Sequence, residues 1–98
     1  MVAIDRNGCI TDVNEAAVGL TGKSREELVF SRFEPHFFDP DRAREGVRLA
    51  LATGVVRKYD LELRGKSGHL VAVSFIASQY MNAQHQVAGV IAIARTLE

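Results

Sequence analysis

Cysteine is almost absent from this chain of 98 residues, since Cys9 is the only one. A single thiol excludes an internal disulfide and a zinc site built from several cysteines, and it fits a reducing compartment such as the cytoplasm. Long apolar runs are absent too. The longest covers residues 87–94 and contains a glycine, whereas a membrane-spanning helix needs about 20 apolar residues. We therefore expect a cytoplasmic protein with no direct membrane contact.

Neither sign of charge is in excess. The 12 Lys and Arg residues balance 12 Asp and Glu residues, so no overall field attracts the chain to nucleic acid. Apolar residues make up 47% and charged residues 24% of the chain, which is typical of a folded domain. A chain of this length builds one hydrophobic core but not two. We predict a single domain without a nucleic-acid partner.

The two ends of the chain suggest a module cut from a longer protein. Met1 leads directly into apolar residues 2–4, so a strand is predicted almost from the first residue. Leu97 and Glu98 match the dipeptide that a common tag-cloning site adds. We therefore assign residues 1–96 to the domain and residues 97–98 to the vector.

Turn residues and hydrophobic periodicity predict five strands. Asn7 and Gly8 predict a type I′ turn between strands at residues 2–5 and 10–13, because both residues tolerate positive φ. After Gly54 the apolar period changes from about 3.6 residues to about 2. Further turn residues then separate three strands of an antiparallel meander, predicted at residues 57–64, 69–80 and 87–95.

Capping residues predict helices between the hairpin and the meander. Asn14 and Ser24 are the expected N-caps of two short helices, and Asp39 with Pro40 begins a longer amphipathic helix that ends at Gly54. The last two strands are apolar on both alternating faces. We therefore expect helices to cover one face of the sheet and a second copy or a flanking helix to cover the other.

Six short segments of the chain share the order and spacing of one family's motifs. They are IDRNG at residues 4–8, VNEAA at 13–17, LTGKSREEL at 20–28, YDLELR at 59–64, KSG at 66–68 and GVIAIAR at 89–95. Over nearly its whole length the chain thus resembles the PAS domain family. One departure is Thr96, which stands where the family often has an aspartate that couples the sheet to an outgoing helix.

The resemblance implies an α+β fold. Its five-stranded antiparallel sheet has the order 2-1-5-4-3, and short helices with one longer helix lie on one face and enclose a small pocket. It also implies a sensory or regulatory module, not an enzyme, that binds a small ligand and relays the signal to an effector domain in the same chain. In bacteria the effector is most often a histidine kinase of a two-component system, a cyclic-dinucleotide enzyme or a transcription regulator.

An interaction module without a ligand is the alternative interpretation. Such a module would form a homodimer through the apolar outer face of its sheet. Because both faces of the last strands are apolar, the choice of the outer face is a hypothesis. The residues predicted for this interface are Val71, Val73, Phe75 and Val90.

Phenylalanines gathered after the second helix predict one wall of the pocket, since aromatic side chains dominate the core of a small domain. The pocket would accept a small and mostly apolar ligand, held by a polar group such as Tyr59 or Ser74. The sequence leaves any cofactor unknown. The predicted lining comprises Phe33, Phe37, Val47, Leu51, Tyr59, Leu61, Ser74 and Ile91.

His36 is the only histidine near this predicted pocket. It is the candidate axial ligand in a haem sensor, although a partly packed side chain is the preferred interpretation. Residues 15–53 contain no cysteine, which excludes the cysteine photochemistry of flavin-binding family members and leaves plain flavin binding open. No metal-ligand pattern and no nucleophilic triad occur at recognisable spacing, so we predict no catalytic residue and no metal site.

Overall fold

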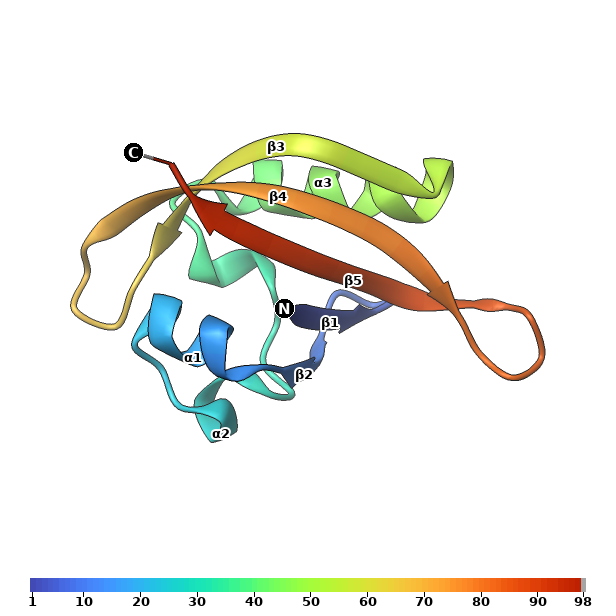
Figure 1. Ribbon diagram of the computed structural model, residues 1–98, viewed down its shortest axis with the longest axis horizontal. Coiled ribbons are helices and arrows are strands. Elements are labelled where there is room, and N and C mark those ends of the chain that lie inside the picture. The colour runs from blue at the N-terminus through green and yellow to red at the C-terminus, as the bar shows by residue number, and fades with distance from the viewer. Residues whose placement is uncertain (98) are drawn as a thin grey trace.

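The structure, a computed structural model, describes residues 1–97 (Figure 1). Glu98, half of the predicted vector dipeptide, lies outside the described residues. The elements in chain order are β1 (Val2–Asp5), β2 (Ile10–Val13), α1 (Glu15–Thr21), α2 (Arg25–Leu28), the 3₁₀ helix η1 (Glu34–His36), α3 (Pro40–Thr53), β3 (Val55–Arg64), β4 (Leu70–Met81) and β5 (Val87–Thr96).

The five strands form one antiparallel sheet in the order β2-β1-β5-β4-β3, which confirms the predicted fold class and strand order. The first strand therefore lies in the interior of the sheet, where Val2 is opposite Ala92 and Ile4 is opposite Val90. Helix α3 packs against β3 and β4, and α2 lies next to β2 (Figure 1). Among residues 1–97, no helix combines the length and the apolarity needed to cross a bilayer.

Each α-helix begins at the residue that the sequence predicts. The side chain of Asn14 accepts a hydrogen bond from a backbone N–H in the first turn of α1, and Ser24 forms a complete capping box with Glu27. Asp39 caps α3 in the same way, and Gly54 ends that helix with a positive φ of 98°. These caps satisfy N–H groups that the first helical turn leaves unpaired, and they fix where each helix starts.

The first turn is not the predicted type I′ turn. Gly8 has a φ of 88°, but Asn7 does not adopt a positive φ. The turn is instead stabilised by Asp5, whose carbonyl accepts from Gly8 and whose carboxylate accepts from the N–H groups of Asn7 and Cys9 at 2.9 and 3.0 Å. An aspartate that binds its own turn in this way competes with the backbone pattern that Asn-Gly alone favours.

The prediction for the outer face of the sheet is wrong. Val73 and Val90 are fully buried, Phe75 is buried, and Val71 packs against the same core. All four predicted interface residues therefore face the helices. The neighbouring positions on β4 and β5 point outward instead, with Ile76 46% exposed and Ile93 58% exposed. A shift of one residue along a strand exchanges the two faces, and here both faces are apolar.

Candidate functional site

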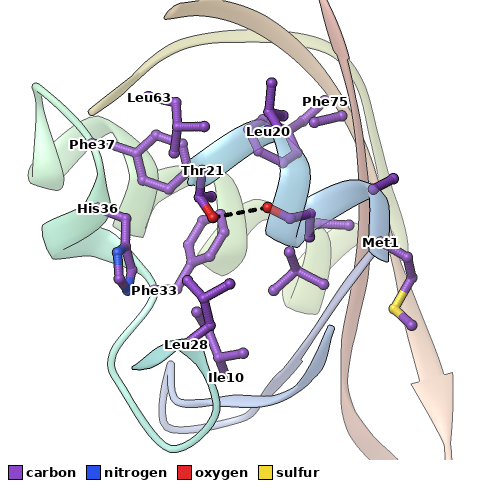
Figure 2. A pocket seen from close by; sticks show the side chains of 15 residues that line it. Met1, Ile10, Leu20, Thr21, Leu28, Phe33, His36, Phe37, Leu63 and Phe75 are labelled. Carbon is purple, nitrogen blue, oxygen red and sulfur yellow. Dashed lines mark hydrogen bonds between the residues drawn. The ribbon is translucent and has the colours of Figure 1, made fainter. Parts of the chain in front are cut away.

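A cavity lies between the inner face of the sheet and the segment that carries α1, α2 and η1 (Figure 2). The cavity has a volume of about 60 Å³, counted as the space that the centre of a water-sized sphere can occupy. Its walls are mostly apolar, and its polar side chains are those of Thr21 and His36. The apolar walls come from both layers and include Met1, Leu20, Leu28, Phe33, Phe37 and Phe75.

A second, smaller cavity of about 20 Å³ lies between α3 and the sheet. Phe33, Phe75 and Ala92 line both cavities and so form the partition between them. The ring of Phe33 lies 4.7 Å from that of Phe37 and 6.0 Å from that of Phe75, centroid to centroid. Tilted and edge-on contacts of this kind stabilise a cluster of rings beyond the burial of their area.

The residues predicted to line one pocket are divided between these two cavities. Phe33 and Phe37 line the larger cavity, whereas Val47, Tyr59 and Leu61 line the smaller one together with Phe33. The hydroxyl of Tyr59 is not available to a ligand there, because it donates to the carbonyl of Arg42 at 2.7 Å.

Three predicted lining residues border neither of these two cavities. Leu51 packs against the core from α3. Ser74, although buried, and Ile91 share the outer face of the sheet with Ile76 and Ile93, because each lies two residues from one of them along its strand. The assignment of Ser74 and Ile91 to the pocket is wrong for the same reason as the interface prediction, because a shift of one residue along a strand exchanges its two faces.

Sequence reasoning missed the contribution of α1 and α2 to the larger cavity. Leu20, Thr21 and Leu28 all line it, and the hydroxyl of Thr21 donates to the carbonyl of Ala17 at 2.9 Å (Figure 2). The helical spacing of Ala17 and Leu20 predicts a buried face on α1 but does not say that a cavity lies beneath it.

His36 lines the cavity from η1, and both of its ring nitrogens have partners. Nδ1 lies 2.8 Å from Lys23 Nζ, and Nε2 lies 2.9 Å from Ser31 Oγ. A lysine ammonium has only donors, so Nδ1 accepts and Nε2 carries the proton. Ser31 Oγ accepts the hydrogen bond from Nε2 and donates its own hydrogen bond to the carbonyl of Leu28 at 2.6 Å. The three side chains therefore form a directed chain of hydrogen bonds that begins at Lys23.

This chain of hydrogen bonds does not favour the ligation of haem iron by His36. An iron ligand at His36 would have to displace either Lys23 or Ser31 from the ring. The sequence did not indicate the Ser31–His36 pair. Its two side chains are as close as a nucleophile and its general base, but the hydrogen bond between them runs in the opposite direction. A base must accept the serine proton, whereas Nε2 of this histidine donates.

We expect the stability of the protein to fall as the pH drops below about 6.5. Burial, and then the nearby ammonium of Lys23, lower the pKa of His36 from its usual 6.5. The unfolded chain therefore binds this proton at a higher pH than the folded protein. The stabilisation is complete above pH 6.5 and is lost as the pH falls toward the folded pKa.

Urea unfolding measured from pH 7.5 to 5.5 tests this expectation. The variant His36→Gln should lose most of the pH dependence in this window. The control His69→Gln, which changes an exposed histidine beside a turn, should retain it. An unchanged slope in His36→Gln would show that His36 is not the responsible group.

Comparison with known families identifies one that covers almost the whole chain. The family described as "PAS domain" matches residues 1–95. A comparison with curated protein sequences finds no significant match.

Solved structures with the same fold come from distant sequences. A PAS domain from Colwellia psychrerythraea superposes with a TM-score of 0.87 at 21% identity, covering 98% of this chain and 83% of that one. PAS-B of Cycle from Drosophila melanogaster gives 0.84 at 14% identity, covering 98% and 97%. The light-oxygen-voltage domain of the blue-light photoreceptor Aureochrome1 gives 0.79 at 15% identity, covering 99% and 74%.

Proposed function

This chain belongs to the PAS domain family, and from that premise we propose that it senses a small molecule in its larger cavity. Members of the family are generally sensory or regulatory modules, not enzymes. The observation that carries the proposal is the cavity itself, which is apolar and lies between the sheet and three short helical segments. The structures of Drosophila Cycle PAS-B, which hold ethylene glycol or glycerol, give general support for small-molecule binding in this fold.

The elements around the cavity are suited to respond to an occupant. Helix α1 has 7 residues and α2 has 4, and helices this short are not stable without tertiary packing. A ligand that packs against them changes the stability of this layer. It shifts the balance between two arrangements if it binds one of them more tightly.

The sheet provides the route by which the signal leaves the cavity. Phe75 and Ala92 line the cavity from β4 and β5, and their neighbours Ile76 and Ile93 are exposed on the opposite face. A change in strand twist at the cavity therefore alters the outer surface of the same two strands. We propose that an effector domain in the same protein receives this change, with a bacterial histidine kinase, cyclic-dinucleotide enzyme or transcription regulator as the candidate classes.

Native mass spectrometry and thermal unfolding of one purified sample test the proposal. We expect short-chain metabolites to raise Tm by several degrees at millimolar concentration, because a ligand that binds only the folded state stabilises it. An added mass that matches the ligand should accompany this rise. If no molecule in a library of small metabolites raises Tm or adds mass, the proposal is wrong.

The same sample distinguishes the two other candidates. An absorbance band of haem or flavin between 350 and 500 nm, roughly where such chromophores absorb, would favour a cofactor sensor. A doubled mass without added ligand would favour the interaction module, for which the exposed Ile76 and Ile93 are the supporting observation. Such a dimer would bury these outward side chains and not the four valine and phenylalanine residues predicted from the sequence.

A further inference from the structure

Lys23 has no acidic partner in the part of the chain that the structure describes. Its ammonium contacts the neutral ring of His36 at 2.8 Å, and no Asp or Glu among residues 1–97 forms an ion pair with it. Other basic residues nearby are paired, as Lys66 is with Glu27. A half-buried ammonium held only by an imidazole lacks the counter-charge that partly buried cations normally have.

This cation lies behind the polar end of the cavity, since it contacts His36 but is not itself part of the lining. His36 and Thr21 line the cavity, Lys23 Nζ contacts the first, and the backbone N–H of Lys23 donates to Thr21 Oγ1 at 3.1 Å. The other side chains of the lining are apolar, and Met1, whose terminal ammonium donates to Asn14 at 2.7 Å, lies far from His36 across the cavity (Figure 2). The His36 end of the cavity is therefore next to a positive charge that has no acidic partner among residues 1–97, and the side chains of the body are apolar.

We propose that the ligand is a short monocarboxylate, whose carboxylate binds Lys23 and His36 while its apolar tail fills the cavity. This inference rests on the proposed function, because it names the ligand class of the same cavity. The cavity is small, with about 60 Å³ open to the centre of a water-sized sphere, so its ligand must be small as well. Short-chain acids such as pentanoate match this requirement.

Binding of the carboxylate would also make His36 take up a proton from the solvent. His36 is neutral beside Lys23, and the only charge that lowers its pKa is that ammonium. To bind both residues, the carboxylate has to replace their direct 2.8 Å contact, and Lys23 then pairs with the ligand instead of the ring. The negative charge next to the ring attracts a proton to it. Nδ1 of the imidazolium then donates to the ligand and Nε2 continues to donate to Ser31. Binding of a carboxylate at pH 7.5 should therefore take up protons, which binding of an uncharged ligand would not.

Isothermal titration at pH 7.5 with pentanoate and with pentan-1-ol tests the inference. We expect pentanoate to bind at least about tenfold more tightly, since charge-assisted hydrogen bonds are stronger than neutral ones. Repeating the titration in two buffers of different ionisation enthalpy measures the proton uptake. We expect uptake with pentanoate only, and we expect it to disappear in the variant His36→Gln.

The variant Lys23→Met should lose the preference for pentanoate but still bind pentan-1-ol, which also shows that its cavity is intact. The control Lys66→Met removes the same charge from an exposed lysine and should keep the preference. Equal affinity for the acid and the alcohol, or a preference that survives in Lys23→Met, would overturn the inference and leave the proposed function standing. Failure of both ligands and of every other small metabolite to bind would overturn both.

Discussion

Replacing Gly89 with alanine is expected to destabilise the protein by about 3 kcal/mol or more, which corresponds to a fall in Tm of more than about 10 °C. A Cβ at this position would overlap the carbonyl oxygen of Ile4 and would lie 3.0 Å from the Cα of Asp5. Both atoms belong to the backbone of β1, so no side-chain rotation relieves the clash. Strand β1 would have to move away from β5. Thermal unfolding followed by circular dichroism measures the effect.

Gly19→Ala is the matched control for this substitution. Gly19 lies in α1, and a Cβ there has no atom within 4 Å. Alanine should therefore stabilise the protein by about 0.5–1 kcal/mol, because it reduces the entropy of the unfolded chain and favours the helix. A Gly89→Ala protein that unfolds at the wild-type temperature would contradict the close pairing of β1 with β5. That pairing also brings Val2 to the wall of the cavity.

Helix boundaries were predictable because each depends on a few neighbouring residues. Asn14, Ser24 and Asp39 each cap a helix through a hydrogen bond that spans three residues, so the local sequence contains the whole signal. The strand order is a long-range property. It came from the resemblance to a family and not from periodicity, because nothing in the spacing of apolar residues places β1 beside β5.

The two faces of β4 and β5 could not be distinguished from the sequence because both are apolar, and on part of β5 the larger side chains point outward. The inner face of β5 carries Ala92 and Ala94, whereas the larger Ile91 and Ile93 point outward. The inner positions are small because Phe75 is opposite Ala94 and the phenylalanine cluster fills the space above this part of the sheet. On this part of β5, the size of an apolar side chain therefore does not identify the buried face.

The sequence identified His36 as the histidine nearest the pocket but did not indicate its partners. Lys23 follows α1, Ser31 follows α2, and His36 belongs to η1, so the fold brings together residues from three separate segments. Their separations of 13 and 5 residues match no helical or strand repeat. Only the packing of these short segments on the sheet creates the contact.

Replacing Phe33 with alanine is expected to lower the free energy of unfolding by about 3–5 kcal/mol and to join the two cavities. Phe33 is buried, lines both cavities, and contacts the rings of Phe37 and Phe75. Its removal costs the burial of one ring and two aromatic contacts, and the neighbouring side chains relax only in part. Urea unfolding of Phe33→Ala measures this loss, and the exposed Phe38, replaced in the same way, should lose far less.

The enlarged space should also change which ligands bind. Apolar cavities that are left by removing a large side chain remain dry and accept benzene. We therefore expect benzene to raise the Tm of Phe33→Ala but not that of the wild-type protein, whose Phe33 occupies this space. Phe33→Leu is the milder variant to use if the alanine protein does not fold, and it should show a smaller rise. If benzene raises the Tm of neither variant, removal of Phe33 does not join the two cavities, and Phe75 and Ala92 are sufficient to separate them.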